Sequence, residues 1–212
     1  HMKEVVVSTD ALMSLILSSI EVFSRETFGI LLGAKSGDMY RITRAVPYLT
    51  AKRDYEYASI DALREKRINS ILAFLTTHKV IGDYHSHPNG PEMLSRHDKK
   101  ELMSMHEGHL AMLVVVTRIK PSQKNRRWIN NPRDLSICGP IAERYFVKIC
   151  SFIHEKKDDK IIKVRTRSTS ISTFNRKLKT FKTVQIKLKN VEKKIKKTLQ
   201  KVQQLKRVKE TL

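Results

Sequence analysis

The residues best suited to chemistry lie in one short run near the middle of the chain. This run, residues 82–98, reads Gly-Asp-Tyr-His-Ser-His-Pro-Asn-Gly-Pro-Glu-Met-Leu-Ser-Arg-His-Asp. His85 and His87 are two residues apart, so an extended segment would point both imidazoles to the same side. Asp98 follows in a segment with helical spacing and can supply a third ligand. Two histidines and one carboxylate around zinc leave a fourth tetrahedral position for water, which is typical of a catalytic site.

The spacing of these residues resembles the signature of the JAMM (MPN+) metalloprotease family. That signature is His-Ser/Thr-His-Pro, six further residues, Ser, two residues and Asp, with a Glu far upstream. The matching positions are His85, Ser86, His87, Pro88, Ser95 and Asp98. The upstream partner is Glu26 in Glu-Thr-Phe-Gly-Ile-Leu-Leu-Gly. The resemblance covers residues 5–117 and extends to deubiquitinases such as that of the proteasomal lid, in a prokaryotic or archaeal form.

The resemblance implies a fold, a cofactor and an activity. The implied fold is α/β, an MPN-type (cytidine-deaminase-like) mixed β-sheet sandwiched by helices. The implied cofactor is one Zn²⁺ per chain, bound by His85, His87 and Asp98. Glu26 would be the general base, and Ser95 would donate a hydrogen bond to the developing oxyanion. The implied reaction is removal of ubiquitin or a ubiquitin-like modifier from lysine in target proteins.

Other readings of the same residues stay open. The two histidines could belong to a closed structural metal site or lie in solvent, and a lone acid such as Glu26 is most often a surface residue. Asp83 departs from the family pattern, because many relatives have Trp there. His106-Glu107-Gly108-His109 is one residue short of the His-Glu-x-x-His motif, and its glycine breaks the helix that this motif needs. We expect His78, His97 and His154 to be surface or lightly packed side chains.

Strands and helices that alternate along the chain must position these residues. Apolar spacing predicts a helix that begins near Ser8 and a capping box in which Ser95 and Asp98 start another. The remaining expected elements are strands at 28–32, 39–46, 80–84 and 110–117 and a helix from Ser59 to about Thr77. Residues 119–140 are polar and rich in breakers, which predicts an irregular loop that is either functional or disordered. The resemblance favours a functional flap, because in the JAMM family a long insertion at this point borders the substrate groove. Residues 145–153 and 161–167 alternate in polarity and predict a hairpin.

Charge divides the chain into two parts. The formal net charge is +21, and from Lys160 onward 18 Lys and Arg face only two acids, Glu192 and Glu210. The rest of the chain is therefore close to an ordinary domain, and the excess of bases belongs to the tail. We expect a catalytic domain at residues 3–167, a linker at 168–173 and a basic helix at 174–212.

The tail repeats apolar residues at alternating spacings of three and four, which predicts a heptad helix. Its flanking lysines, Lys187, Lys194 and Lys201, disfavour self-pairing and favour an acidic helix or a polyanion. A helix docked on its own domain with a solvated basic face is the alternative. The heptad positions are Phe181, Val184, Leu188, Val191, Ile195, Thr198, Val202 and Leu205.

The composition also limits the setting in which the chain works. Two cysteines, Cys138 and Cys150, are too few for a disulfide framework, and the longest early apolar run is too short to cross a membrane. We therefore expect a cytoplasmic protein without a membrane partner. The initial His1-Met2 resembles a cloning remnant and is left out of the argument.

The expected catalytic domain and the expected basic helix each suggest partners and alternative functions. The expected partners are conjugates of ubiquitin or a ubiquitin-like protein, and a proteasome-like or other assembly reached through the tail. One rival is a scaffold module whose basic helix binds nucleic acid or an acidic protein. Another is a related JAMM peptidase that acts on a different small-protein adduct.

Overall fold

The computed structural model describes residues 3–48, 52–53, 58–59 and 62–210. They form two compact units, His1–Ile171 and Ser172–Leu212. The strands are β1 (Glu4–Val7), β2 (Phe28–Ser36), β3 (Met39–Pro47), β4 (Lys52–Arg53), β5 (Ala58–Ser59), β6 (Lys79–Pro88), β7 (Leu110–Arg118), β8 (Ile129–Asn131), β9 (Ser136–Ile141), β10 (Tyr145–Glu155) and β11 (Lys160–Ser168). The helices are α1 (Thr9–Glu21), α2 (Ala62–Leu75), α3 (Arg96–Ser104) and α4 (Ile171–Glu210), with 3₁₀ turns η1 (Pro121–Gln123) and η2 (Lys156–Asp158).

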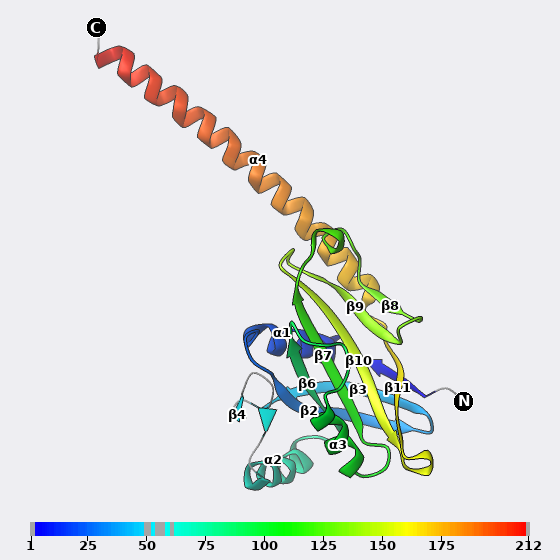
Figure 1. The fold of residues 1–212 in the computed structure, drawn as a ribbon. Helices are drawn as coiled ribbons and strands as arrows, with labels where there is room; N and C mark the ends of the chain where they lie inside the picture. The colour runs from blue at the N-terminus through cyan, green and yellow to red at the C-terminus, as the bar shows by residue number, and fades with distance from the viewer. Residues whose placement is uncertain (1–2, 49–51, 54–57, 60–61, 211–212) are drawn as a thin grey trace. The chain divides into compact units, whose positions relative to one another are not determined.

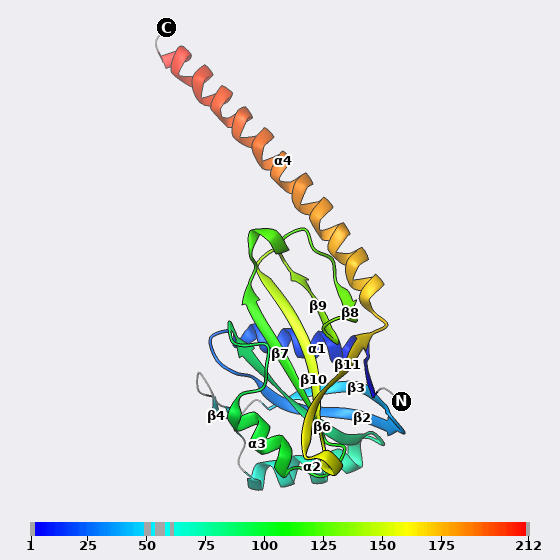
Figure 2. The same cartoon turned by 45° about the vertical axis from the view of Figure 1, so that its right-hand side comes forward.

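The main sheet of the first unit closes on itself. Its strand order is β11-β1-β3-β2-β6-β7-β10-β9-β8, and β10 also pairs with β11. Seven strands from β11 to β10 therefore form a closed mixed barrel, visible in Figures 1 and 2, with β9 and β8 attached to one side of β10. The expected α/β fold, an MPN-type (cytidine-deaminase-like) sheet sandwiched by helices, is therefore wrong in its central element.

The long strand β10 is the physical reason for closure. One of its edges pairs with β7 from Tyr145 to Ile153. The other edge is shared, because Tyr145–Ile149 pairs with β9 and Ser151–Glu155 pairs with β11. Since β1 then lies parallel to both β11 and β3, no long edge strand is left in the ring. Closure removes the unpaired backbone groups that an open sheet would expose.

Helices pack on both faces of the ring. Figures 1 and 2 place α1 behind the strands and α3 in front of them. Ser8 caps α1 by accepting a hydrogen bond from the backbone of Ala11, as expected from the sequence. On the α3 face, Leu94 and Leu102 pack against Leu113, Phe152 and other residues of β7 and β10. These contacts fix α3 over β7 and β10, and β7 is the strand next to β6, which carries His85 and His87.

Helix α2 covers a smaller apolar cluster. Ile68 and Leu72 of α2 pack against Ile30 and Leu32 of β2. The helix begins at Ala62 rather than at the expected Ser59, which lies in the short strand β5. The strand prediction at 110–117 is confirmed by β7, in which every residue from Leu110 to Val116 is buried. The hairpin prediction is confirmed by the antiparallel pairing of β10 and β11.

The region expected to be an irregular flap contains regular structure. Residues 119–140 include η1 and the antiparallel pair β8 and β9. Trp128 anchors this region, because its side chain is buried and its Nε1 donates a 2.9 Å hydrogen bond to the Pro140 carbonyl. A Cβ on Gly139 would lie 2.3 Å from the Trp128 ring, so only glycine allows this packing. Breaker residues here mark turns of a hairpin and not the absence of structure.

The second unit is the long helix α4. The helix begins at Ile171. The linker expected at residues 168–173 therefore contains the end of β11 and the first residues of α4. Large apolar side chains along it stay exposed, from 43% at Phe181 to 61% at Ile186. Within the described parts of the chain, no helix combines the length and the apolar character needed to cross a lipid bilayer.

Candidate metal centre

Strand β6 presents the two histidines on one face of the barrel. His85 lies opposite Leu113 of β7, and His87 lies opposite Val115. Paired residues of neighbouring strands point to the same side, so both imidazoles face the cluster under α3. The residue between them, Ser86, points to the opposite face. Side chains alternate in direction along β6, as expected from the sequence, so the imidazoles of His85 and His87 lie on one face. Both are buried, and their ring centroids are 5.0 Å apart.

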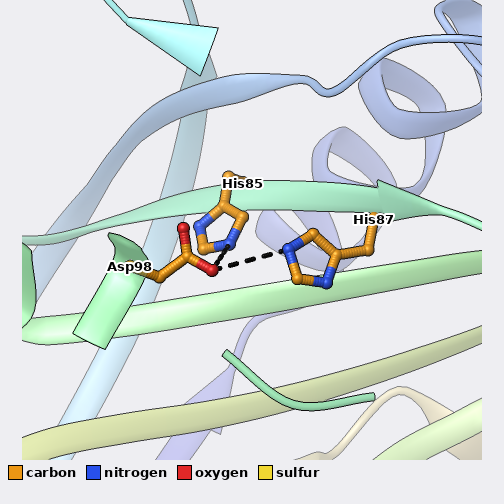
Figure 3. Close-up of side chains that lie close together, drawn as sticks. All are labelled: His85, His87 and Asp98. Atoms are coloured by element: carbon orange, nitrogen blue, oxygen red, sulfur yellow. Dashed lines mark ion pairs between the residues drawn. The ribbon is translucent and has the colours of Figure 1, made fainter. Parts of the chain in front are cut away.

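Helix α3 supplies the carboxylate from across the face. Ser95 is its N-cap, and a capping box forms because Asp98 N donates to Ser95 Oγ at 3.1 Å while Ser95 N donates to Asp98 Oδ2 at 2.6 Å. This box holds the Asp98 side chain in one orientation. The same Oδ2 atom then points toward both imidazoles (Figure 3).

The three side chains converge within a few ångströms. Asp98 Oδ2 lies 3.4 Å from His85 Nε2 and 3.6 Å from His87 Nε2. One ligand atom from each residue lies within 4.8 Å of the others. Among the residues that the structure describes, His85, His87 and Asp98 are the one group of this kind. The arrangement is compatible with a metal site.

The electrostatics of the group favour a cation. Burial by itself raises the pKa of the Asp98 carboxyl, but the rings of His85 and His87 outweigh this and hold that pKa far below its ordinary value. Burial lowers the pKa of His87, while Asp98 and the Pro91 carbonyl raise it above the ordinary value. The carboxylate therefore stays ionised, and positive charge at its side is stabilised.

Two hydrogen-bonding details test whether the residues fit a metal. His87 Nδ1 lies 3.0 Å from the Pro91 carbonyl oxygen and donates to it, which leaves the Nε2 lone pair facing Asp98 and His85. His85 Nε2 is buried and makes no hydrogen bond with any described residue. A buried ring nitrogen that makes no hydrogen bond is costly unless something else binds it. A metal ion would use both nitrogens, so the residues fit a metal.

Glu26 lies beside the group rather than within it. Its carboxylate is buried, and Oε1 is 3.6 Å from His87 Nε2. Two hydrogen bonds hold the backbone of the next residue, Thr27, against β6: Thr27 N donates to Ser86 Oγ at 2.8 Å, and Ser86 N donates to Thr27 O at 2.9 Å. The sequence pattern contained Ser86 but gave it no role. The available signal for a role of Ser86 was its position between His85 and His87, because in a strand its side chain points to the face opposite theirs.

Glu26 and Ser95 also face a common cleft. The cleft has a volume of about 530 Å³, and His87 and Pro91 form part of its wall. Ser95 Oγ accepts from Asp98 N, which leaves its own proton for another acceptor. The structure therefore brings all five residues singled out from the sequence to one place.

Asp83 and His109 form a contact that the sequence did not indicate. Their Oδ2 and Nε2 atoms are 2.6 Å apart, although the residues are 26 positions apart in the chain. Asp83 stands two residues before His85 on the same face of β6 and also lines a pocket with His85, Asp98 and Glu101. His109, which belongs to the segment that falls one residue short of the His-Glu-x-x-His motif, is thus paired with Asp83.

Comparison with known proteins agrees with this geometry. The family model described as prokaryotic homologs of the JAB domain matches residues 9–130. This match spans more than half of the chain, so the chain belongs to that family, and the resemblance to the JAMM/MPN family is confirmed. No curated protein matches the chain.

Solved structures add support for the fold. The solution structure of protein DSY2949 from Desulfitobacterium hafniense aligns with a TM-score of 0.54 at 15% sequence identity. The alignment covers 78% of this chain and 92% of that chain. At this level of identity the likeness concerns the fold alone.

Proposed function

We propose that this protein is a zinc-dependent isopeptidase that removes ubiquitin or a ubiquitin-like modifier from lysine side chains. The observation that carries the proposal is the position of Glu26. Its carboxylate lies 3.6 Å from His87 Nε2, next to a group of ligands that is already complete without it. A structural metal site needs no such buried acid at its side, whereas a hydrolytic site needs a base there.

His85, His87 and Asp98 would hold the zinc. When bound by three protein ligands, zinc lowers the pKa of a coordinated water toward about 7 and polarises a carbonyl group. The capping box of α3 keeps Asp98 in place, and the Pro91 carbonyl fixes the tautomer of His87. These contacts orient the ligands before any substrate arrives.

Glu26 and Ser95 would act on the substrate. Glu26 would accept a proton from the attacking water and pass it to the leaving lysine amine, a role worth on the order of 10²–10⁴ in rate. Ser95 would donate its hydroxyl proton to the carbonyl oxygen as negative charge develops there. Both residues line the 530 Å³ cleft, which offers room for the extended tail of a modifier.

A panel of modifier–lysine conjugates tests this proposal. Full-length protein loaded with zinc is incubated with each conjugate, and free modifier is measured by mass spectrometry with and without a chelator. We expect cleavage of at least one conjugate, its loss with the chelator and its recovery when zinc is returned. Cleavage that persists in Glu26→Gln and in chelator would overturn the proposal.

We also propose that α4 docks an acidic helix of a partner protein. From Ser172 onward the chain carries fourteen Lys and Arg against Glu192 and Glu210. Val184, Leu188, Val191 and Ile195 lie at heptad positions and are 48–57% exposed. An apolar stripe with lysines at its edges favours a partner with the same stripe and acidic edges. Such a partner could be part of a proteasome-like assembly or carry the substrate.

We place this activity in the cytoplasm. Cys138 and Cys150 are both free and buried. Free thiols are the normal state in a reducing compartment.

A further inference from the structure

A second pocket lies apart from the metal centre. It has a volume of about 260 Å³ and is formed by the start of β1, the β2–β3 hairpin, the turn before β7 and the turn between β10 and β11. None of the residues that line it belongs to the group of His85, His87 and Asp98. The pocket is therefore distinct from the candidate metal centre.

The hydroxyl of Tyr40 is the first sign of a ligand. Tyr40 lines the pocket, its side chain is 0% exposed, and its Oη makes no hydrogen bond with any described residue. A Cβ on Gly108 would lie 3.5 Å from this Oη and 2.4 Å from Lys35 Nζ. The hydroxyl and the ammonium therefore face the same gap beside Gly108, whose φ of +80° suits glycine.

His154 provides a second buried atom of the same kind. Its Nε2 lies 2.9 Å from Asp159 Oδ1, while its Nδ1 is buried and has no hydrogen-bond partner among the described residues. His154 lines the same pocket as Tyr40. Tyr40 and His154 thus line one cavity, and each has a buried polar atom that makes no hydrogen bond with a described residue, as His85 Nε2 does at the candidate metal centre. Buried polar atoms normally have a partner, so a shared ligand accounts for both.

The charges around the pocket indicate an anion. Lys3, Lys35, Lys156 and Lys157 line it. Lys3 is engaged with Glu155 at 2.7 Å, but the other three lysines make no ion pair with any described residue. Glu107 and Asp158 also border the pocket and are exposed, as Lys35, Lys156 and Lys157 are, so the lysines without an ion pair outnumber these two acids. Lys35 Nζ lies 5.2 Å from the centroid of the Tyr40 ring, so one of these charges stands beside the buried hydroxyl.

The donors and acceptors select among anions. Lysines act as point charges that suit phosphate, whereas carboxylates are more often bound by the planar fork of Arg, and no Arg lines this pocket. Tyr40 can donate to a charged oxygen. When its proton is on Nε2, His154 Nδ1 is an acceptor, and a monohydrogen phosphate can donate to it. A phosphate group satisfies both atoms, but an ionised carboxylate satisfies only the hydroxyl.

We propose that this pocket binds a phosphate group, supplied either by inorganic phosphate or by a small phosphate monoester. Tyr40 donates to one oxygen, His154 pairs with another and Lys35 supplies charge. The site is independent of the metal and of the proposed isopeptidase activity, so it can be tested without a turnover assay.

Calorimetric titration of the full-length protein with inorganic phosphate tests the site, with acetate at equal ionic strength as the comparison. Tyr40→Phe should weaken phosphate binding at least about tenfold, because it removes a hydrogen bond to a charged group. Without phosphate, Tyr40→Phe should unfold at the same temperature as the native protein or higher, since an orphaned hydroxyl is removed. A purely structural Tyr40 hydroxyl would give the opposite sign.

Two further variants distinguish phosphate binding in the pocket from nonspecific attraction of phosphate to the positively charged chain. Lys35→Met should weaken phosphate binding, whereas Lys189→Met on α4 should not. A phosphate monoester such as phosphoserine that binds more tightly than inorganic phosphate identifies an organic ligand, and the reverse identifies the free anion. Equal binding of phosphate and acetate, or unchanged binding of phosphate by Tyr40→Phe, would overturn the proposal.

Discussion

Ser86 Oγ lies 2.8 Å from the backbone nitrogen of Thr27, and Ser86 N donates back to the Thr27 carbonyl at 2.9 Å. Both residues are 1% exposed. The residue between His85 and His87, the two candidate ligands, is thus tied to the residue next to Glu26. This pair of hydrogen bonds sets where the proposed base stands relative to the proposed metal ligands.

Replacing Ser86 tests that relationship. Ser86→Ala leaves the buried Thr27 N–H without its acceptor, so we expect the free energy of unfolding to fall by about 1–3 kcal/mol. Zinc content should be retained, but turnover should fall because Glu26 is no longer held in place. Denaturant unfolding, metal analysis and kcat are measured on the same preparation. Ser86→Thr keeps the hydroxyl and should recover much of the activity; equal activity in Ser86→Ala would contradict the positioning role.

Glu26→Gln separates proton transfer from metal binding. Glutamine keeps the size of the side chain but cannot accept the proton, so we expect kcat to fall by about 10²–10⁴ with little change in KM. Zinc content should equal that of the native protein. Glu21→Gln, an exposed acid on α1, is the matched control. Loss of zinc from Glu26→Gln would show that Glu26 is a ligand and refute its assignment as base.

His85→Ala and Asp98→Asn should lose zinc and activity together. Each removes one of three converging ligands, and three protein ligands are the usual minimum for catalytic zinc. Zinc affinity is measured by competition with a coloured chelator. His97→Ala, adjacent in sequence but outside the group, should keep its zinc. Normal zinc affinity in either ligand variant would exclude that residue from the metal site.

Asp134 gives a pH dependence that does not involve the metal centre. Its carboxylate contacts Lys148 and Lys163 at 2.5 and 2.8 Å. Burial raises the pKa of Asp134, but these lysines and Ser136 outweigh it and bring that pKa to about 2. The folded-state pKa is therefore below the unfolded value of about 3.9, and the stabilisation is full above about pH 4 and is lost as the pH falls toward 2.

Asp134→Asn should accordingly lower the free energy of unfolding at pH 7 by about 1 kcal/mol, a figure reduced for solvent screening of this partly exposed group. The variant should also lose stability less steeply than the native protein between pH 4 and pH 2. Urea unfolding across this range gives both results, with the exposed Glu143→Gln as control. Parallel curves for Asp134→Asn and the native protein would contradict the pKa argument.

Removal of residues 174–212 tests the two-part organisation. The ligands, Glu26 and the closed sheet all lie before the deleted helix, so we expect a folded domain that retains zinc and cleaves a small isopeptide substrate. Binding to a synthetic acidic heptad peptide should be lost, and in the full chain it should weaken with salt. Unfolding of the truncated chain would show that α4 is part of the catalytic domain. Preference of the full chain for DNA over the peptide would favour a nucleic-acid partner.

The sequence by itself determined the local parts of the candidate site. Spacing of two along a strand placed His85 and His87 on one face, and the capping box of Ser95 and Asp98 followed from residues three apart. The heptad pattern of α4 and the buried run of β7 were equally visible, because each depends on periodicity within one element.

Only the tertiary structure decided how these parts meet. The closed sheet depends on β10 sharing one edge between β9 and β11, and no local pattern records which strand pairs with which. The hairpin within residues 119–140 depends on Trp128 packing against Gly139, a contact between residues that propensity treats separately. Likewise, the Asp83–His109 pair joins segments far apart in the chain, and the burial of the Tyr40 hydroxyl without a partner is set by its tertiary surroundings. Hydrogen-bond satisfaction and burial are properties of the folded chain, because both depend on neighbours that sequence distance does not specify.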